Sequence, residues 1–262
     1  MVEPSGSGLI ASAPFLGVMI GCKRKKKYDL NHRKVNYFPG RKIILTAAGM
    51  LQAVFADLSP EQRGKLEDLA QEVFLKKGEQ LFGPGDRSRG FYVVLEGVIR
   101  VYGMSSQGKE ITQEIAGELG AFALASPFSG TYQCFAEALK DSRLYLIKKK
   151  EFLDLVTGDP GFAVEWMRLL SHMLIHLRRR LVDLTLKDPK ARIAGYLVLL
   201  AEMQNSRSIV LPVPRKELAI FLGMTHETFY RTARELTNDG LVRFTGQSVD
   251  ILDQERLAEI TE

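Results

Sequence analysis

The hydrophobic positions of this chain change their spacing along the sequence, and the change divides it into parts. Between residues 73 and 147 the apolar residues fall in short runs, rich in β-branched and aromatic side chains and separated by glycine and polar residues. From about Glu151 to Lys187 they recur every three or four residues instead. Short bounded runs indicate strands, whereas the second spacing is that of a helix with one apolar face. The sequence therefore predicts a sheet-rich domain followed by a long helix.

The first part predicts an antiparallel β-barrel or jelly roll. A short helix should precede it, with Ser59 as the N-cap and Pro60 at the first helical position. Turn residues such as Gly78, Gly97 and Gly117 separate the apolar runs. Many short strands at close spacing are typical of this architecture. The expected strands are residues 73–75, 80–82, 91–95, 98–102, 111–115, 132–138 and 144–147.

The apolar seam of the long helix alternates between spacings of three and four residues, which is typical of a helix packed on a partner helix. The alternative is a helix that packs only on its own β-domain. Asp188 and Pro189 end the helix and mark a hinge, and an apolar helix over residues 193–203 follows. We expect a parallel dimer interface formed by Trp166, Leu170, Met173, Leu177, Leu181 and Leu184.

The segment after the hinge has the pattern of a winged helix-turn-helix. Pro214 suits the first position of one helix, and Gly223 suits a tight turn that needs a positive φ. Thr225 is a good N-cap for a second helix, expected over residues 225–237. Two short apolar runs within residues 241–252 predict a β-hairpin wing. The second helix of such a unit enters the major groove of DNA, so double-stranded DNA is the expected partner.

The outward face of that second helix is polar and charged, while Phe229, Ala233 and Leu236 should point inward. An arginine can donate two hydrogen bonds to guanine and a glutamate can accept one from cytosine, whereas phosphate contacts add affinity without sequence preference. We expect base contacts from Thr225, His226, Glu227, Tyr230 and Arg231. We expect phosphate contacts from Arg215, Lys216, Arg234 and Arg243.

Charge and composition fit a nucleic-acid partner. The chain has 262 residues, a net charge of +5 and a pI of about 9.1. Its two cysteines, Cys22 and Cys134, are too few for a disulfide scaffold and fit a reducing cytoplasm. No Ser/His/Asp set, phosphate-binding glycine loop or carboxylate pair has catalytic spacing, so no enzyme is expected. The alternative left open is a ligand-binding signalling module or enzyme whose C-terminal helices only pack.

Residues 1–49 fit neither domain, and we expect a disordered extension or a start of the chain placed too early. The apolar stretch from Leu9 to Gly21 is interrupted by Pro14 and is too short to cross a bilayer. Cys22 after Gly21 resembles a bacterial lipobox, but Met19 stands where that motif has leucine. A membrane anchor is the alternative, and no membrane partner is expected.

The order of β-domain, long helix and winged helix-turn-helix resembles the CRP/FNR family of bacterial transcription regulators. The resemblance covers about residues 51–262 and is carried by residues 77–79, 85–86, 91–97, 186–188, 227–231 and 251–257. It implies an α+β chain whose sensor domain resembles a cyclic-nucleotide-binding domain. The implied domains are the sensor at residues 50–155, the dimerisation helix and hinge at 156–188, and the DNA-binding domain at 189–262.

The resemblance also bears on the effector. Family members that bind cyclic AMP pair its phosphate with an arginine about a dozen residues after a Gly-Glu-Leu cassette. Here Gly117-Glu118-Leu119-Gly120 is followed by Tyr132 at that position, so a cyclic nucleotide is not expected. Oxygen sensors of the FNR type use four cysteines for an iron–sulfur cluster, and this chain has two. No metal site is predicted.

A finer similarity is to regulators of the denitrification (Dnr-like) and hybrid-cluster-protein (HcpR) type, which respond to nitric oxide through haem. It is carried by Thr131-Tyr132, residues 211–214 and residues 227–229. It implies haem with nitric oxide, or a redox signal, as the effector. The family resemblance further implies a cytoplasmic homodimer, with RNA polymerase as a partner if the protein activates transcription. The candidate effector pocket residues are Tyr102, Met104, Tyr132 and His172.

Overall fold

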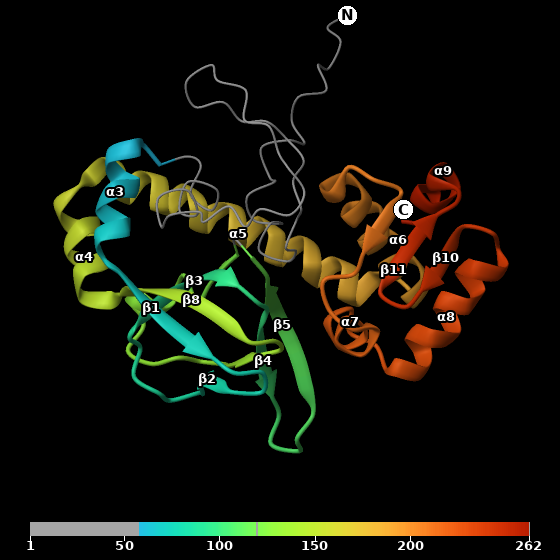
Figure 1. Ribbon diagram of the computed structural model, residues 1–262, viewed down its shortest axis with the longest axis horizontal. Helices are drawn as coiled ribbons and strands as arrows, with labels where there is room; N and C mark the ends of the chain where they lie inside the picture. Colours follow the sequence, from blue (N-terminus) through green and yellow to red (C-terminus); the bar gives the residue numbers. More distant parts are fainter. Residues whose placement is uncertain (1–57, 119, 262) are drawn as a thin grey trace, which may run out of the picture.

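A computed structural model describes residues 58–118 and 120–261 of the chain. The expectations for residues 1–49, and for a sensor domain that starts at residue 50, lie outside the described residues. The sensor domain is at the lower left of Figure 1 and the C-terminal domain is at the right, with a long helix running between them.

The sensor domain consists of two antiparallel four-stranded sheets, with strand orders β1-β8-β3-β6 and β2-β7-β4-β5. Side chains from both sheets, including Leu75, Val101 and Leu146, share one hydrophobic core. This arrangement confirms the prediction that residues 73–147 form an antiparallel, sheet-rich domain. The strands are β1 Ala70–Leu75, β2 Gln80–Phe82, β3 Gly90–Glu96, β4 Ile99–Met104, β5 Glu110–Ala116, β6 Ala121–Phe122, β7 Phe135–Ala138 and β8 Ser142–Lys148.

Helix α3 (Pro60–Asp68) precedes the sheets and begins as predicted, with Ser59 and Gln62 capping each other's backbone N–H groups. Strand β1 begins three residues before the predicted run, β6 was not predicted, and β7 begins three residues late. Strand β6 has only two residues, which is too short to show an alternating pattern. Strand β7 starts at Phe135 because the Tyr132 backbone bonds to Gly85 and Asp86 instead of extending the strand.

The helical spacing of residues 151–187 is divided between two helices, α4 (Lys149–Gly158) and α5 (Pro160–Leu186). Asp159 separates them, and its carboxylate accepts a hydrogen bond from the Phe162 N–H at 2.9 Å. Pro160 takes the first position of α5, where its missing N–H costs nothing. Figure 1 shows α5 running from α4, above the sensor sheets, to the C-terminal domain.

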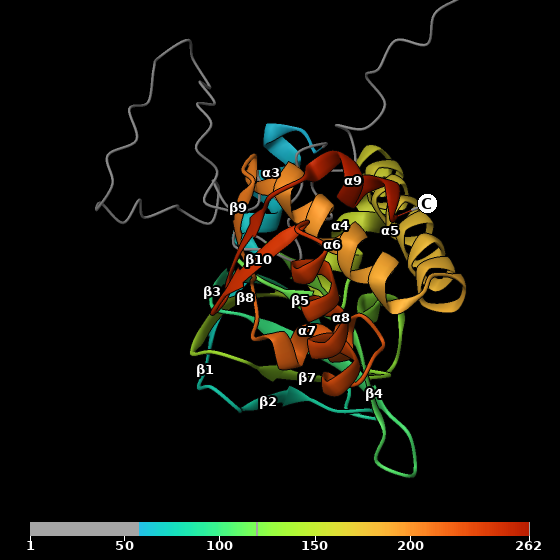
Figure 2. The same cartoon turned by 90° about the vertical axis from the view of Figure 1, so that its right-hand side faces the viewer.

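The C-terminal domain begins at the predicted hinge, where Asp188 caps α6 by accepting from the Ala191 N–H. Its three-stranded sheet has the order β10-β11-β9, so the predicted wing hairpin gains a third strand. Figure 2 shows α7 and α8 in front of the domain, next to this sheet. The elements are α6 Pro189–Gln204, β9 Ser208–Val210, α7 Arg215–Phe221, α8 His226–Asn238, β10 Val242–Thr245, β11 Ser248–Ile251 and α9 Gln254–Glu259.

Candidate DNA-binding surface and sensor interior

Helices α7 and α8 meet in the turn that the sequence predicts. Gly223 has a φ of 65°, and the Met224 N–H donates to the Ala219 carbonyl oxygen at 3.0 Å. The Thr225 hydroxyl accepts from the Thr228 N–H at 3.2 Å and caps α8. These contacts fix the angle between the two helices, as a helix-turn-helix requires.

Helix α8 has one buried face and one exposed face. Phe229 and Leu236 are fully buried in the C-terminal core, and Ala233 lies beside them. None of the ion pairs among the described residues involves Arg231 or Arg234, so both guanidinium groups are open to an external acceptor. The exposed face consists of Glu227, Tyr230, Arg231 and Arg234.

The other residues predicted to contact DNA differ in their exposure and in the contacts that they already make within the protein. Lys216 and Arg243 are exposed. Arg215 instead braces the wing, because its Nη2 donates to the Gly246 carbonyl oxygen at 2.6 Å and its guanidinium lies 4.9 Å from the centre of the Phe244 ring. His226 is half-buried, and its Nε2 is enclosed with no hydrogen-bond partner among the described residues.

The four residues predicted for the effector pocket have separate surroundings. Tyr132 is 3% exposed inside the sensor domain. Tyr102 stacks on Phe135 and lies under the guanidinium of Arg100. Met104 is 51% exposed at the end of β4, and His172 is half-buried on α5. The structure does not bring these side chains together as one pocket.

Aromatic rings fill the sensor interior around Tyr132. Its ring stacks on Phe82 with 3.7 Å between the centres, and its hydroxyl donates to the Gly90 carbonyl oxygen at 3.0 Å. The Tyr92 hydroxyl lies 3.3 Å away, and the Tyr92 ring stacks on Phe122. Burial, together with the hydrogen bond to Tyr132, raises the pKa of Tyr92 well above its ordinary value. The position expected to pair with a cyclic phosphate therefore holds a ring whose hydroxyl is already engaged.

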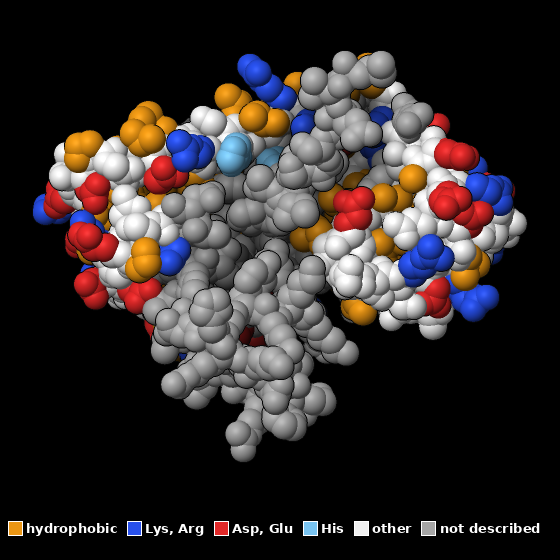
Figure 3. Space-filling view, turned by 90° about the horizontal axis from the view of Figure 1, so that it is seen from above, with side chains coloured by type: hydrophobic (Ala, Val, Ile, Leu, Met, Phe, Trp, Pro, Cys, Tyr) orange, Lys and Arg blue, Asp and Glu red, His pale blue; other side chains and the backbone are white. Residues whose placement is uncertain are grey.

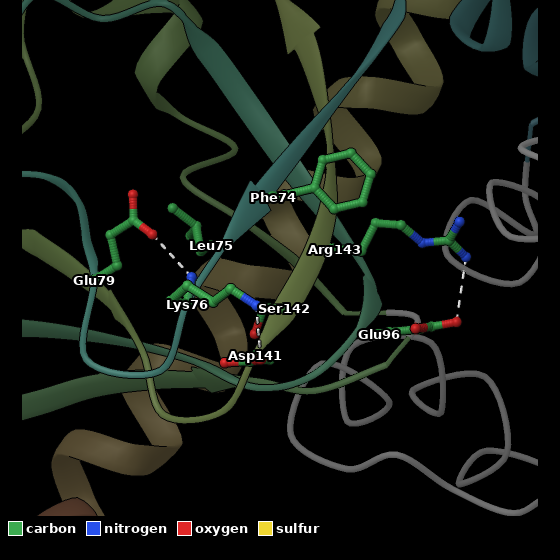
Figure 4. Close-up of a pocket in the computed structure, with 8 residues that line it drawn as sticks. All are labelled: Phe74, Leu75, Lys76, Glu79, Glu96, Asp141, Ser142 and Arg143. Atoms are coloured by element: carbon green, nitrogen blue, oxygen red, sulfur yellow. Dashed lines mark hydrogen bonds and ion pairs between the residues drawn. The ribbon is translucent and has the colours of Figure 1, made fainter.

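A hollow of about 320 Å³ lies on the surface of the sensor domain and is shown in Figure 4. Phe74 on β1 projects beside it and is exposed. The charges that line it pair with one another, since Arg143 donates to Glu96 at 3.3 Å and Lys76 to Asp141 at 3.2 Å. A ligand here would have to displace these ion pairs, and we assign none.

Helix α5 exposes a stripe of apolar side chains. Figure 3 shows hydrophobic side chains near the pale-blue histidines at the upper edge of that view. Leu181 leaves 62% of its surface open to solvent, and further exposed apolar residues lie on the same helix. The α5 stripe consists of Val164, Met167, Leu174, Ile175, Leu177, Leu181, Val182 and Leu186.

The structure corrects the predicted seam at Trp166. This side chain is 2% exposed, and its ring centre lies 4.5 Å from that of Phe152 and 5.1 Å from that of Phe91. It is therefore part of the protomer's own core and is not available to a second chain. Leu170 and Met173 pack partly against the same core. Helical spacing identified the apolar face of α5 without showing which neighbour covers it.

The two domains are connected by two arginines, neither of which is among the predicted site residues. Arg100 of β4 is 5% exposed and lies 3.8 Å from a carboxylate oxygen of Glu217 in α7. Arg180 of α5 donates to backbone carbonyl oxygens of β5 and of Phe221, at the end of α7. The available signal was a lone arginine inside the apolar run of residues 98–102. We call Arg100, Thr112, Arg180, Glu217 and Phe221 the interdomain clasp.

Two further findings concern the described part of the chain. Across residues 58–118 and 120–261, no helix combines the length and apolar character needed to span a membrane. In the same ranges, no group of three or more His, Cys, Asp or Glu side chains is placed to hold a metal ion.

Two family models match the chain, one for each domain. The cyclic nucleotide-binding domain matches residues 72–159, and the Crp-like helix-turn-helix domain matches residues 191–260. The nitrogen fixation regulation protein FixK of Bradyrhizobium diazoefficiens is 28% identical over 215 residues, which are 78% of this chain and 88% of FixK.

Solved structures share the same fold. FixK2 from Bradyrhizobium japonicum has a TM-score of 0.68 at 23% identity, covering 74% of this chain and 98% of that one. A transcriptional regulator of the CRP/FNR family from Thermus thermophilus has a TM-score of 0.57 at 27% identity, covering 73% and 98%.

The comparisons and the geometry agree on the same architecture. The relatives are transcription regulators, which confirms the expectation that the chain is not an enzyme. An antiparallel sensor domain, a long helix and a winged helix-turn-helix follow one another in this chain, and it belongs to the CRP/FNR family of DNA-binding transcription regulators.

Proposed function

We propose that this chain is an effector-responsive, homodimeric regulator that reads an inverted-repeat DNA site with α8. The observation that carries the proposal is the exposed face of α8, which is held on a buried core. Among the described residues, no side chain forms an ion pair with Arg231 or Arg234. Arg231 follows Glu227 by one helical turn, so both can reach base edges when α8 lies in the major groove. Lys216 and Arg243 are suited to the flanking phosphates.

A second copy of the chain is the partner that fits the α5 stripe. Each apolar side chain of the stripe is between 47 and 79% exposed, and water is an unfavourable neighbour for so much apolar surface on one helix. Parallel pairing of two α5 helices would bury the stripes around a two-fold axis. The two copies of α8 would then be related by the same axis, which matches an inverted repeat.

The proposed effector is a ligand other than a cyclic nucleotide. Tyr132 brings no positive charge to the position that would pair with a cyclic phosphate, and its ring packs on Phe82. The hypothesis of haem with nitric oxide, or of a redox signal, is supported by sequence resemblance alone. Of the candidate residues, Tyr102 stacks on Phe135, Met104 is exposed at the end of β4, and His172 is half-buried on α5. RNA polymerase is a further proposed partner if the protein activates transcription.

The proposal is tested by selecting bound sequences from a pool of random duplexes. The wild-type protein should enrich an inverted repeat, and binding should weaken steeply with salt. Arg231→Ala should cost about 1–3 kcal/mol on the enriched site and relax the preference at one base pair. Arg256→Ala in α9 removes the same charge away from α8 and is the matched control.

Two outcomes would contradict the proposal. Equal affinity of the wild-type and Arg231→Ala proteins for the enriched duplex would mean that α8 does not read bases. A wild-type protein that enriches no sequence even at low salt would favour the signalling module whose C-terminal helices only pack.

A further inference from the structure

We propose that Arg100 and Arg180 are positioning residues for DNA recognition, because they fasten α7 to the sensor domain and so set the spacing between the two α8 helices of a dimer. The inference rests on the proposed function, since spacing matters only when two copies of α8 bind one DNA site. Arg100 and Arg180 would thus influence which DNA sites are bound, although neither residue belongs to α8, the helix proposed to contact the bases.

Arg100 connects the sensor sheet to α7 by charge. Its Nε donates to the Thr112 hydroxyl at 3.0 Å, and the same nitrogen lies 3.8 Å from an oxygen of Glu217. That Glu217 oxygen is buried and has no hydrogen-bond partner among the described residues, so Arg100 is its nearest opposite charge. Two sensor carboxylates, Glu110 and Glu137, hold the rest of the guanidinium. Burial alone would lower the pKa of Arg100, but these carboxylates outweigh it and raise the pKa.

Arg180 connects three elements through backbone groups. From α5, its Nη2 donates to the carbonyl oxygens of Thr112 at 2.6 Å and of Phe221 at 3.1 Å, and its Nη1 donates to that of Gln113. Its guanidinium also stacks over the Phe221 ring, 4.1 Å from the centre. A planar guanidinium with five N–H donors can bind three carbonyl oxygens and stack on a ring at the same time. The ammonium group of lysine cannot do both.

The two arginines meet at Thr112, which is fully buried in β5. Arg100 reaches its hydroxyl and Arg180 reaches its carbonyl oxygen. The two domains also share apolar contacts here, because Val98 and Ile115 of the sensor domain pack in the core of the C-terminal domain. Figure 1 shows α7 next to β5 at this point. The clasp therefore joins strands β4 and β5 and helix α5 to helix α7.

Helix α7 transmits this constraint to α8. The two helices share the turn at Gly223, and the Arg192 guanidinium donates to the Leu222 and Gly223 carbonyl oxygens of that turn. The chain link between the domains is short, at Lys187 and Asp188, but a hinge of extended residues can still rotate. With the clasp closed, α8 has one orientation relative to α5 and hence to the two-fold axis.

The test uses the full-length chain and a set of duplexes built from the inverted repeat that the wild-type protein enriches. Its two half-sites are kept constant while the spacer between them is lengthened or shortened by one or two base pairs, and a single half-site duplex is added. The variants are Glu217→Gln, which removes the charge from α7, and Arg180→Lys, which removes the fork. Glu202→Gln on the exposed side of α6 is the matched control.

We expect both clasp variants to keep the wild-type affinity for the half-site while their preference for the best spacer falls by about fivefold or more. The control should keep the sharp spacer optimum. The same optimum in all four proteins would overturn the inference. A parallel loss of half-site binding and thermal stability would also overturn it, since the contacts would then be structural only. If the wild-type protein itself shows no spacer optimum, the proposed function fails instead.

Discussion

The two halves of α5 carry the same apolar periodicity but have different neighbours. In the first half, Phe162 and Trp166 are buried against aromatic rings of the sensor domain. In the second half, Leu177 and Leu181 are exposed in the protomer. Phe162 and Trp166 present rings to a core that already contains rings, whereas Leu177 and Leu181 are aliphatic. The period therefore shows where a helix is apolar, and the shape of the partner surface decides what covers it.

The largest expected effect comes from the buried half. Trp166→Ala should lower the free energy of unfolding by about 3–5 kcal/mol, because it leaves a cavity between Phe91 and Phe152. Urea unfolding followed by circular dichroism would measure it. Met167→Ala, one residue along and exposed, should change the stability by much less. Similar losses in both variants would show that burial does not set Trp166 apart from an exposed position on the same half of the helix.

The second prediction concerns the exposed half. Leu181→Glu should raise the dimer dissociation constant by about 100-fold or more, because each carboxylate would be buried near its symmetry mate. Analytical ultracentrifugation over a range of concentrations measures this, and the protomer should keep its secondary structure. Leu181→Met keeps the volume and apolar character and serves as the control. An unchanged dimer with Leu181→Glu would place the interface away from the α5 stripe.

The third prediction tests the contact between the second half of α5 and strand β5. Glu114 of β5 lies near Arg180, and burial raises the pKa of Glu114 from 4.5 to about 7, against the opposing charge of Arg180. A carboxyl whose folded pKa is raised stabilises the protein at low pH, and that contribution is lost as the pH rises through about 7. Burial also lowers the pKa of Arg180 to about 10, so the arginine stays charged across this range.

Glu114→Gln keeps the neutral form at every pH. It should therefore match the wild type near pH 5 and be more stable by about 2 kcal/mol near pH 8. Urea unfolding at the two pH values measures the difference, and Glu118→Gln at an exposed position is the control. If the variant and the wild type differed by the same free energy of unfolding at both pH values, Glu114 would not titrate between them. Its raised pKa beside Arg180 would then be wrong.

The smallest expected effect is at the turn between α7 and α8, where Leu184 from the end of α5 packs. Gly223 has a φ of 65°, and a Cβ there would meet Leu184 Cδ2 at 2.7 Å. Gly223→Ala should cost about 1–2 kcal/mol, from backbone strain plus this contact. Gly240→Ala has a similar φ of 72° with open space around it, so it isolates the strain. Equal costs would mean that Leu184 moves aside freely.

The sequence predicted the C-terminal domain well because its signals are local. Gly223 and Thr225 mark the turn within three residues, and the alternation of buried Phe229 with exposed Arg231 needs no knowledge of the rest of the fold. The same holds for Ser59 at α3 and Asp188 at α6. The break before α5 was equally readable, since Asp159 and Pro160 are a cap and a helix start.

The remaining features depend on residues far apart in the sequence. Trp166 is buried by Phe91, 75 positions earlier, and no local pattern distinguishes that neighbour from a second chain. Tyr132 leaves the strand because its ring packs on Phe82 and its backbone bonds to Asp86. The interdomain clasp joins Arg100 to Glu217, which lies 117 positions later. Such contacts appear only when the sheets and helices are in place.

The pairing of β9 with β11 affects the order in which a newly made chain can fold. Strand β9 precedes α7, yet its only ladder in the described residues is with β11, and the α9 side chain Leu257 is fully buried in the same core. The sensor domain can fold while the ribosome still holds residues 248–257, but the support of α8 stays incomplete until they emerge. During translation, therefore, the N-terminal β-domain is expected to fold before the C-terminal domain that holds α8 is complete.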